Sequence, residues 1–275
     1  MTKTRLLLFC SLILAGCASA QPEASSAATR PLASAAPAPS TLSSASSAEV
    51  RAPAQTVVAA ADRSDADRAL DAGRKPAELL SFFGVSAGMR VLDLAAGGGY
   101  TTELLARAVG DNGVVYGENP KFVLGFAEST WAARLQKPVM KRVVRVDAEF
   151  DAPWPAEVKD LDLVTFVLFY HDTVWLETNR AKMNANIFAA LKPGGTLGIV
   201  DHSAKAGDGL NDVKTLHRIE ESIVKDELTK AGFVLDAEAD FLREPTDTRD
   251  WSASPKVAGE KRGHSDRFVL RFKKP

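Results

Sequence analysis

The chain alternates between short apolar runs and longer amphipathic stretches from about residue 62 to residue 275. Apolar runs bounded by glycine, proline or aspartate are typical of buried strands, and apolar residues spaced three or four apart are typical of helices. Strand patterns are found at residues 89–95, 114–117, 143–146, 161–169, 196–200, 233–241 and 267–272. Helical patterns are found at residues 65–83, 101–109, 121–135, 178–191 and 212–231.

This order of elements predicts an α/β fold. Strands that alternate with helices form a mostly parallel sheet with helices on both faces. Residues 161–169 are apolar apart from Asp162 and Thr165, as expected for a central strand covered on both sides. Residues 62–275 suit a single domain. We therefore expect a Rossmann-like three-layer sandwich with a seven-stranded sheet.

The amino-terminal residues have the pattern of an export signal. Lys3 and Arg5 precede an apolar run at residues 6–14, which is too short to span a bilayer permanently. Residues 14–17, Leu-Ala-Gly-Cys, resemble the bacterial lipobox. That resemblance implies that residues 1–16 are a lipoprotein signal peptide and that Cys17 carries lipid. An ordinary signal peptide, cut a few residues later with Cys17 discarded, is the alternative.

The lipobox also implies a location. Acyl chains on Cys17 would anchor the protein stably, and we expect the membrane to be contacted through this lipid only. Ala18 follows the cysteine where a retention signal of the inner membrane would place aspartate. The expected location is therefore the periplasmic face of a bacterial membrane, the outer one in a Gram-negative cell. Residues 17–61 are dominated by alanine, serine and proline and are expected to be a disordered linker.

Composition narrows the range of partners. The chain has a formal net charge of −1, which gives no electrostatic footprint for nucleic acid. Its two cysteines are Cys10 and Cys17, so the domain after the signal has no thiol for a disulfide or for a zinc site built on cysteine. A small-molecule partner is expected, and the oligomeric state is not indicated.

The strongest motif follows the first predicted strand. Asp93 ends an apolar run, and Ala95, Gly97, Gly98 and Gly99 lead into a helical pattern. Glycine lets the backbone approach a nucleoside cofactor closely and adopt angles that other residues avoid. A nicotinamide-binding loop would carry G-x-G-x-x-G, but threonine occupies the third glycine position counted from Gly97. Among the cofactor-binding functions that such a loop can indicate, a nicotinamide-dependent enzyme is therefore the least supported hypothesis.

The loop resembles the first motif of class I S-adenosylmethionine (SAM)-dependent methyltransferases, (D/E)-x-G-x-G-x-G. Asp93, Gly97 and Gly99 fall on that pattern, and Ala95 replaces its first glycine. The turn at residues 191–197, L-K-P-G-G-T-L, is similar to one that precedes the fifth strand of that family. The resemblance implies a last strand inserted antiparallel between the fifth and sixth, and SAM as the cofactor.

Further cofactor contacts are expected where the next strands end. Glu118 and Asn119 follow the second strand, and a carboxylate there can accept both ribose hydroxyls of an adenosine. Asp147 and Ala148 follow the third strand, where the resemblance implies an acidic residue against the adenine amino group. Glu118 can also be a surface residue, and Asp147 can simply cap a turn.

Two histidines beside aspartates follow the fourth and fifth strands. His171 and Asp172 follow one, and Asp201 and His202 end the other. A histidine oriented by a carboxylate can act as a general base near neutral pH, so His171, Asp172 and His202 are the candidate catalytic residues. The same groups can instead bind a divalent cation, although no metal site is assigned. His217 is expected to be structural or exposed to solvent, and so is His264.

Two classes of function remain open at this stage. Residues 67–76, 170–172, 217–220 and 266–270 together resemble a bacterial group described as predicted methyltransferases, many with export signals. That resemblance implies a SAM-dependent methyltransferase acting on a small-molecule acceptor. Because SAM is made in the cytoplasm, a non-catalytic exported protein that binds SAM, S-adenosylhomocysteine or another adenosine-like ligand is the alternative.

Overall fold

The computed structural model describes residues 54–275. Cys17, the expected signal peptide and most of the expected linker lie outside the described residues. Residues 54–59 are helical, and Ala54 is buried against the apolar core. The folded region therefore begins before residue 62, where the sequence analysis places the start of the domain.

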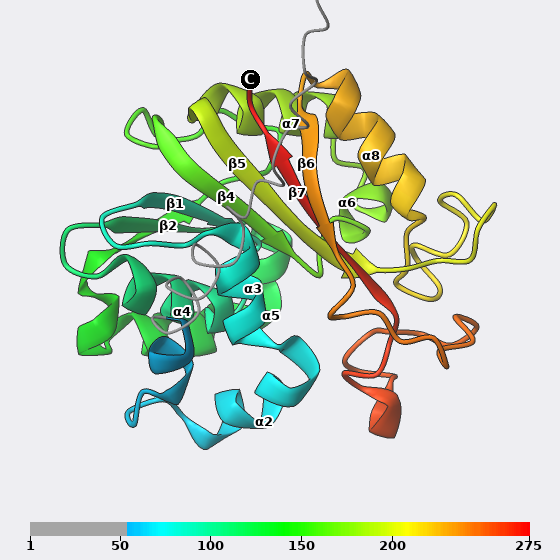
Figure 1. Ribbon diagram of the computed structural model, residues 1–275, viewed down its shortest axis with the longest axis horizontal. Helices are drawn as coiled ribbons and strands as arrows, with labels where there is room; N and C mark the ends of the chain where they lie inside the picture. The colour runs from blue at the N-terminus through cyan, green and yellow to red at the C-terminus, as the bar shows by residue number, and fades with distance from the viewer. Residues whose placement is uncertain (1–53) are drawn as a thin grey trace, which may run out of the picture. The chain divides into compact units, whose positions relative to one another are not determined.

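A single seven-stranded sheet organises the described residues, with strand order β3-β2-β1-β4-β5-β7-β6. Strands β1 to β5 run parallel, and β7 is antiparallel to both β5 and β6 (Figure 1). The expected fold class, with its inserted antiparallel last strand, is confirmed. The strands are β1 (Arg90–Leu94), β2 (Val114–Asn119), β3 (Val143–Asp147), β4 (Leu161–Val167), β5 (Leu191–His202), β6 (Val234–Ala239) and β7 (Arg267–Lys273).

Helices cover both faces of this sheet because alternate strand residues point to opposite sides. One apolar cluster joins Leu92 and Val164 to α7 and α8, and the other joins Val91 and Leu163 to α3, α4 and α5. The helices are α2 (Asp65–Arg74), α3 (Pro76–Phe83), α4 (Tyr100–Val109), α5 (Lys121–Leu135), α6 (Asp172–Trp175), α7 (Arg180–Ala190) and α8 (Glu221–Lys230). Short 3₁₀ turns occupy Pro138–Arg142 and Gly259–Lys261.

The expected long helix at residues 212–231 is wrong in its first half. Only α8, Glu221–Lys230, is helical, and residues 211–216 form turns. Ile219 instead forms a bridge with Ser203, and its backbone N–H donates to His202 O at 3.0 Å. Pairing with the end of β5 therefore replaces the expected helix at this point. It also keeps the turns at residues 211–216 close to the end of the sheet.

None of the helices between residues 54 and 275 has the length and apolar character needed to cross a membrane.

Candidate cofactor and acceptor site

A cavity of about 800 Å³ lies at the carboxyl ends of the strands. The strand order reverses between β1 and β4, and ligands of open α/β sheets bind at such a switch point. The loop after β1 and the residues after β4 both line the cavity. Its volume falls in the usual range of about 300–1,000 Å³ for cofactor and small-molecule pockets.

The glycine loop is held open by its own backbone and by β2. Ala95 and Gly97 have φ values of 51° and 57°, in the left-handed region where glycine is favoured. The side chain of Asn119 brackets Gly97, accepting from its N–H at 2.8 Å and donating to its carbonyl at 3.2 Å. Asn119 is therefore a support for the loop and does not line the cavity.

The last glycine of the loop has a packing role. A Cβ atom on Gly99 would lie 2.6 Å from the Trp131 ring and 2.8 Å from Arg134 Cδ, and φ there is 82°. Gly99 does not line the cavity, whereas Gly97 and Gly98 do. Substitution of Gly99 would therefore disturb the packing of α4 against α5, whereas a Cβ atom on Gly97 would meet only Ala95 O within 4 Å, at 3.9 Å.

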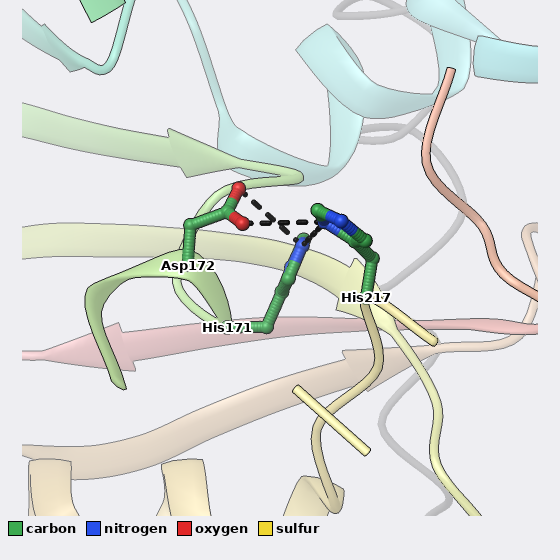
Figure 2. Close-up of side chains that lie close together, drawn as sticks. All are labelled: His171, Asp172 and His217. Atoms are coloured by element: carbon green, nitrogen blue, oxygen red, sulfur yellow. Dashed lines mark hydrogen bonds and ion pairs between the residues drawn. The ribbon is translucent and has the colours of Figure 1, made fainter. Parts of the chain in front are cut away.

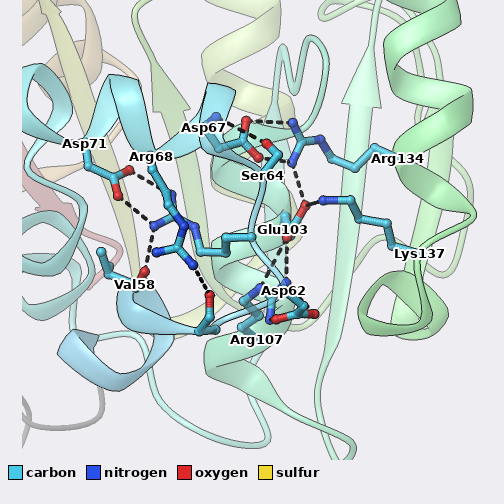
Figure 3. Close-up of polar contacts among 12 residues, drawn as sticks. Val58, Asp62, Ser64, Asp67, Arg68, Asp71, Glu103, Arg107, Arg134 and Lys137 are labelled. Atoms are coloured by element: carbon cyan, nitrogen blue, oxygen red, sulfur yellow. Dashed lines mark hydrogen bonds and ion pairs between the residues drawn. The ribbon is translucent and has the colours of Figure 1, made fainter.

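An ionic network ties the loop to the helices around it (Figure 3). Arg134 on α5 donates to Gly98 O at 2.5 Å and pairs with Asp67 on α2 and Glu103 on α4. Glu103 is buried and also pairs with Arg107 and Lys137. Because several partly buried charges share these partners, the network fixes the loop before any ligand binds.

The carboxylate of Asp93 has its hydrogen-bond partners inside the protein. Its carboxylate accepts hydrogen bonds from Thr102 Oγ at 2.6 Å and Thr165 Oγ at 2.8 Å, and it is 1% exposed. Burial raises the pKa of Asp93 to about 6, against the effect of these two hydrogen bonds. Asp93 lines the cavity floor and joins β1, β4 and the first turn of α4.

Glu118 has one oxygen with no partner. Its Oε2 accepts from the N–H of Ala95 at 3.1 Å, whereas Oε1 is buried and makes no hydrogen bond to any described residue. Burial raises the pKa of Glu118 well above its usual range. A buried, unpaired carboxylate oxygen is costly unless a ligand donates to it. Glu118 is not itself a lining residue, but Ala95, which donates to it, does line the cavity.

The two residues expected to contact adenine lie away from the cavity. Asp147 is exposed and pairs with Arg145 at 2.8 Å, and Arg145 also pairs with Glu128. Ala148 packs against the apolar core. The structure does not bring either residue to the cavity lining. Aromatic side chains are among the residues that do line the cavity: Phe122 and Trp175 have ring centroids 5.2 Å apart, and both line it with Phe126.

Arg74 is a cavity residue that the sequence analysis did not single out. Its guanidinium lies 4.4 Å from the centre of the Tyr100 ring, and it has no hydrogen bond or ion pair with any residue of the described part. Burial lowers its pKa, as does the charge of nearby Arg262. An unpaired guanidinium in a cavity is suited to bind a carboxylate.

His171 is held by β5 and directed toward the cavity. Asp201 accepts from both the His171 N–H (2.8 Å) and Nδ1 (2.7 Å), and it is fully buried. Burial alone would lower the pKa of His171, but the charge and hydrogen bond of Asp201 outweigh that effect, and the pKa is raised. The other ring nitrogen, Nε2, faces Asp172 and His217 at 3.4 and 3.2 Å (Figure 2).

His217 thus lies at the site and not in open solvent. Its Nδ1 is 3.3 Å from Asp172 Oδ1, and its side chain remains 25% exposed. The sequence analysis missed this role because it placed His217 within a helix. The expected convergence of residues after β4 and β5 does occur, and His171, Asp172 and His202 all line the cavity. His264 is exposed and is not among the lining residues.

His202 is placed differently from His171. Its Nδ1 lies 2.7 Å from Ser265 Oγ, and its ring is 5.8 Å from that of His171. Burial lowers the pKa of His202 well below its usual range, and the charge of His171 acts in the same direction. His202 is therefore neutral at neutral pH, which suits a hydrogen-bonding role in the cavity wall.

Comparison with known proteins identifies solved structures that share this fold. No protein-family model matches the sequence, and no curated protein is similar enough to be recognised as a relative. Solved structures do match. A SAM-dependent methyltransferase from Aquifex aeolicus is 20% identical, with a TM-score of 0.52 over 72% of this chain and 88% of that one.

Two further structures agree with that match. A candidate methyltransferase in complex with the Trm112 methyltransferase activator of Haloferax volcanii has a TM-score of 0.53 at 16% identity, over 82% of this chain and 98% of that chain. A candidate sarcosine dimethylglycine methyltransferase from Galdieria sulphuraria has a TM-score of 0.53 at 17% identity, over 74% and 86%. The domain therefore has the class I methyltransferase fold, as the sequence analysis expects.

Proposed function

We propose that this protein is a SAM-dependent methyltransferase that acts on a small-molecule acceptor. The observation that carries the proposal is the unpartnered Oε1 of Glu118, behind a glycine loop that lines a cavity at the switch point of the sheet. The likeness in fold to SAM-dependent methyltransferases supports the choice of cofactor. A carboxylate beside such a loop suits the ribose of an adenosine.

The cavity and the residues directly behind its lining have groups for each part of SAM. Glu118 would accept from the ribose hydroxyls, and the open face of Gly97 would let the ligand approach the backbone. The unpaired guanidinium of Arg74 would bind the methionyl carboxylate. Phe122 and Trp175 supply an apolar wall. These residues fit the cofactor without any residue from the expected adenine contacts at Asp147 and Ala148.

His171 and Asp172 would face the acceptor. The sulfonium of SAM is already an electrophile, so the protein mainly aligns the acceptor, the methyl group and the leaving sulfur. Asp201 holds the ring of His171 so that Nε2 faces His217 and Asp172, which line the cavity with it. The acceptor's nucleophilic atom would be positioned at this end, where its proton can be removed.

A non-catalytic protein that captures SAM, S-adenosylhomocysteine or a similar ligand remains the second candidate. The cofactor-facing residues would be the same in both cases. The buried His171–Asp201 pair favours the enzyme because a simple ligand trap has no need of an oriented histidine away from the cofactor loop. Tight binding of SAM with no methyl transfer to a broad acceptor panel would favour the binding protein.

Replacement of Glu118 by alanine is expected to weaken SAM binding by about 1.5–3 kcal/mol, roughly 10- to 150-fold, because a hydrogen bond to a charged group is lost. Isothermal titration calorimetry with SAM measures this change. Glu128→Ala is the matched control, since Glu128 is an exposed carboxylate on α5 paired with Arg145. Equal affinity in Glu118→Ala and the wild type would place the ribose elsewhere.

We also propose that the protein is a lipoprotein anchored through Cys17 at the periplasmic face of a bacterial membrane. The lipobox-like residues 14–17 and the short basic and apolar region before them support this proposal. The alanine-, serine- and proline-rich segment that follows would serve as a tether between the membrane and the domain.

Cys17→Ser is expected to leave the precursor uncleaved and without lipid, since the lipoprotein pathway modifies the cysteine before cleavage. Detergent partitioning and mass spectrometry of the protein made in a bacterial host measure both effects. Cys10→Ser is the control, because Cys10 lies within the signal and should have no effect. A wild-type mature protein that is unmodified and begins after Ala20 would contradict the anchor.

A further inference from the structure

We infer that His171, Asp172 and His217 form a binding site for a divalent transition-metal ion, with zinc the closest match to the geometry. Two imidazoles and one carboxylate are a common ligand set of catalytic zinc and of non-haem iron. The inference does not rest on the proposed function, because the ion's binding is measured without SAM.

The donor atoms are spaced as ligands of one ion (Figure 2). His171 Nε2 lies 3.2 Å from His217 Nδ1, and these nitrogens lie 3.4 and 3.3 Å from one or the other oxygen of Asp172. Ligands bound at about 2.0–2.1 Å in a tetrahedron are about 3.3–3.4 Å apart. An ion can therefore be bound with little more than a rotation of the carboxylate.

Neighbouring groups orient two of the three ligands. Asp201 accepts from Nδ1 of His171, and two backbone N–H groups also donate to its carboxylate, so Nδ1 carries hydrogen and Nε2 presents its lone pair. Trp175 Nε1 donates to Asp172 Oδ1 at 2.7 Å. A carboxylate behind a histidine ligand is the usual outer-shell arrangement at zinc.

The backbone at His217 is also unusual. Its φ of 52° lies in the left-handed region, which is uncommon for a residue with a side chain. The bridge between Ile219 and Ser203 fixes the chain just after it. This segment directs the imidazole at His171 and Asp172 at the expense of backbone strain, a feature that clusters at functional sites.

The site has an open side. All three residues line the large cavity, and the His217 side chain is partly exposed, whereas His171 and Asp172 are buried. Three protein ligands with one free position are typical of a catalytic zinc site, in contrast to the four ligands of a structural site. The free position would take water or an oxygen donor from a molecule in the cavity.

The test is a calorimetric titration of Zn²⁺ into the full-length protein, purified in detergent, stripped of metal by a chelator and free of SAM. One ion per chain is expected. His217→Ala should lower the affinity at least about a hundredfold, since loss of an outer-shell partner alone costs about 10- to 100-fold. Asp172→Asn should lower it as well, while its amide oxygen can still accept from Trp175.

His264→Ala is the control, since His264 is exposed and away from the cavity, and it should bind zinc as the wild type does. The Co²⁺-substituted protein should show the intense visible absorption of a four-coordinate site, and His217→Ala should lose it. Absence of saturable Zn²⁺ binding would overturn the inference, leaving the two imidazoles as a hydrogen-bonded pair. Equal affinity in the wild type, His217→Ala and Asp172→Asn would overturn it too.

Discussion

Gly97→Val is expected to lower the affinity for SAM by about a hundredfold. A Cβ atom at Gly97 meets only Ala95 O within 4 Å, at 3.9 Å, so the valine side chain would stand in the open cavity. Overpacking of the site by the valine side chain weakens binding by about 1–3 kcal/mol. The left-handed backbone at residue 97 separately lowers the stability of the variant by about 1–2 kcal/mol. Calorimetry with SAM measures the affinity, and circular dichroism verifies the fold.

Gly84→Val separates the effect on the ligand from the effect of strain. Gly84 ends α3 with a φ of 71°, and a Cβ there meets nothing within 4 Å. The strain is thus comparable, but Gly84 is not a cavity residue. This variant should lose stability and retain SAM affinity. If Gly97→Val and Gly84→Val bind SAM equally well, the glycine loop does not contact the ligand.

His171→Asn is expected to lower the rate of methyl transfer by about 10²–10⁴-fold and to leave SAM affinity within a few-fold of the wild type. The Asn amide can still donate to Asp201, but the Nε2 atom is lost. A general base that takes a proton from the acceptor typically raises the rate by about 10²–10⁴-fold. If His171 is instead a metal ligand, the substitution removes that ligand. Release of S-adenosylhomocysteine in the presence of an acceptor panel measures turnover.

A chelator distinguishes the two roles of His171. If the metal site is used, metal removal should lower wild-type turnover and added Zn²⁺ should restore it, whereas His171→Asn should not respond. If His171 acts directly as a base, chelation should have no effect on the wild type. Full turnover by His171→Asn on an acceptor that the wild type methylates would show that alignment alone accounts for catalysis.

The fold was predictable from the sequence to a large extent. The strand patterns identified all seven strands, and the clearest of them are β1 and β4, whose nearly continuous apolar runs are typical of parallel strands covered on both faces. The first half of the expected helix at 212–231 was wrong because the chain there pairs with the end of β5 through Ile219. A long-range backbone bridge of this kind leaves no periodic signal.

The candidate site was predictable in part at both ends, since the glycine loop and the three predicted acceptor-facing residues (His171, Asp172 and His202) line the cavity. Asp93 and Glu118 lie near the carboxyl ends of β1 and β2, and Gly97 follows β1, and the topology of the sheet brings these strand ends together. Asp147 was misplaced because its neighbour Arg145 draws it into an exposed ion pair. Arg74 and His217 come from a helix end and a turn, where position depends on tertiary packing that no local pattern shows.

Calorimetric titration of the wild-type protein with SAM, S-adenosylhomocysteine and NAD tests the central claim most directly. We predict saturable binding of SAM and S-adenosylhomocysteine at one site per chain, with little or no binding of NAD, because the loop lacks the third glycine of a dinucleotide motif. Binding of NAD in preference to both SAM and S-adenosylhomocysteine, or binding of none of the three, would contradict the account.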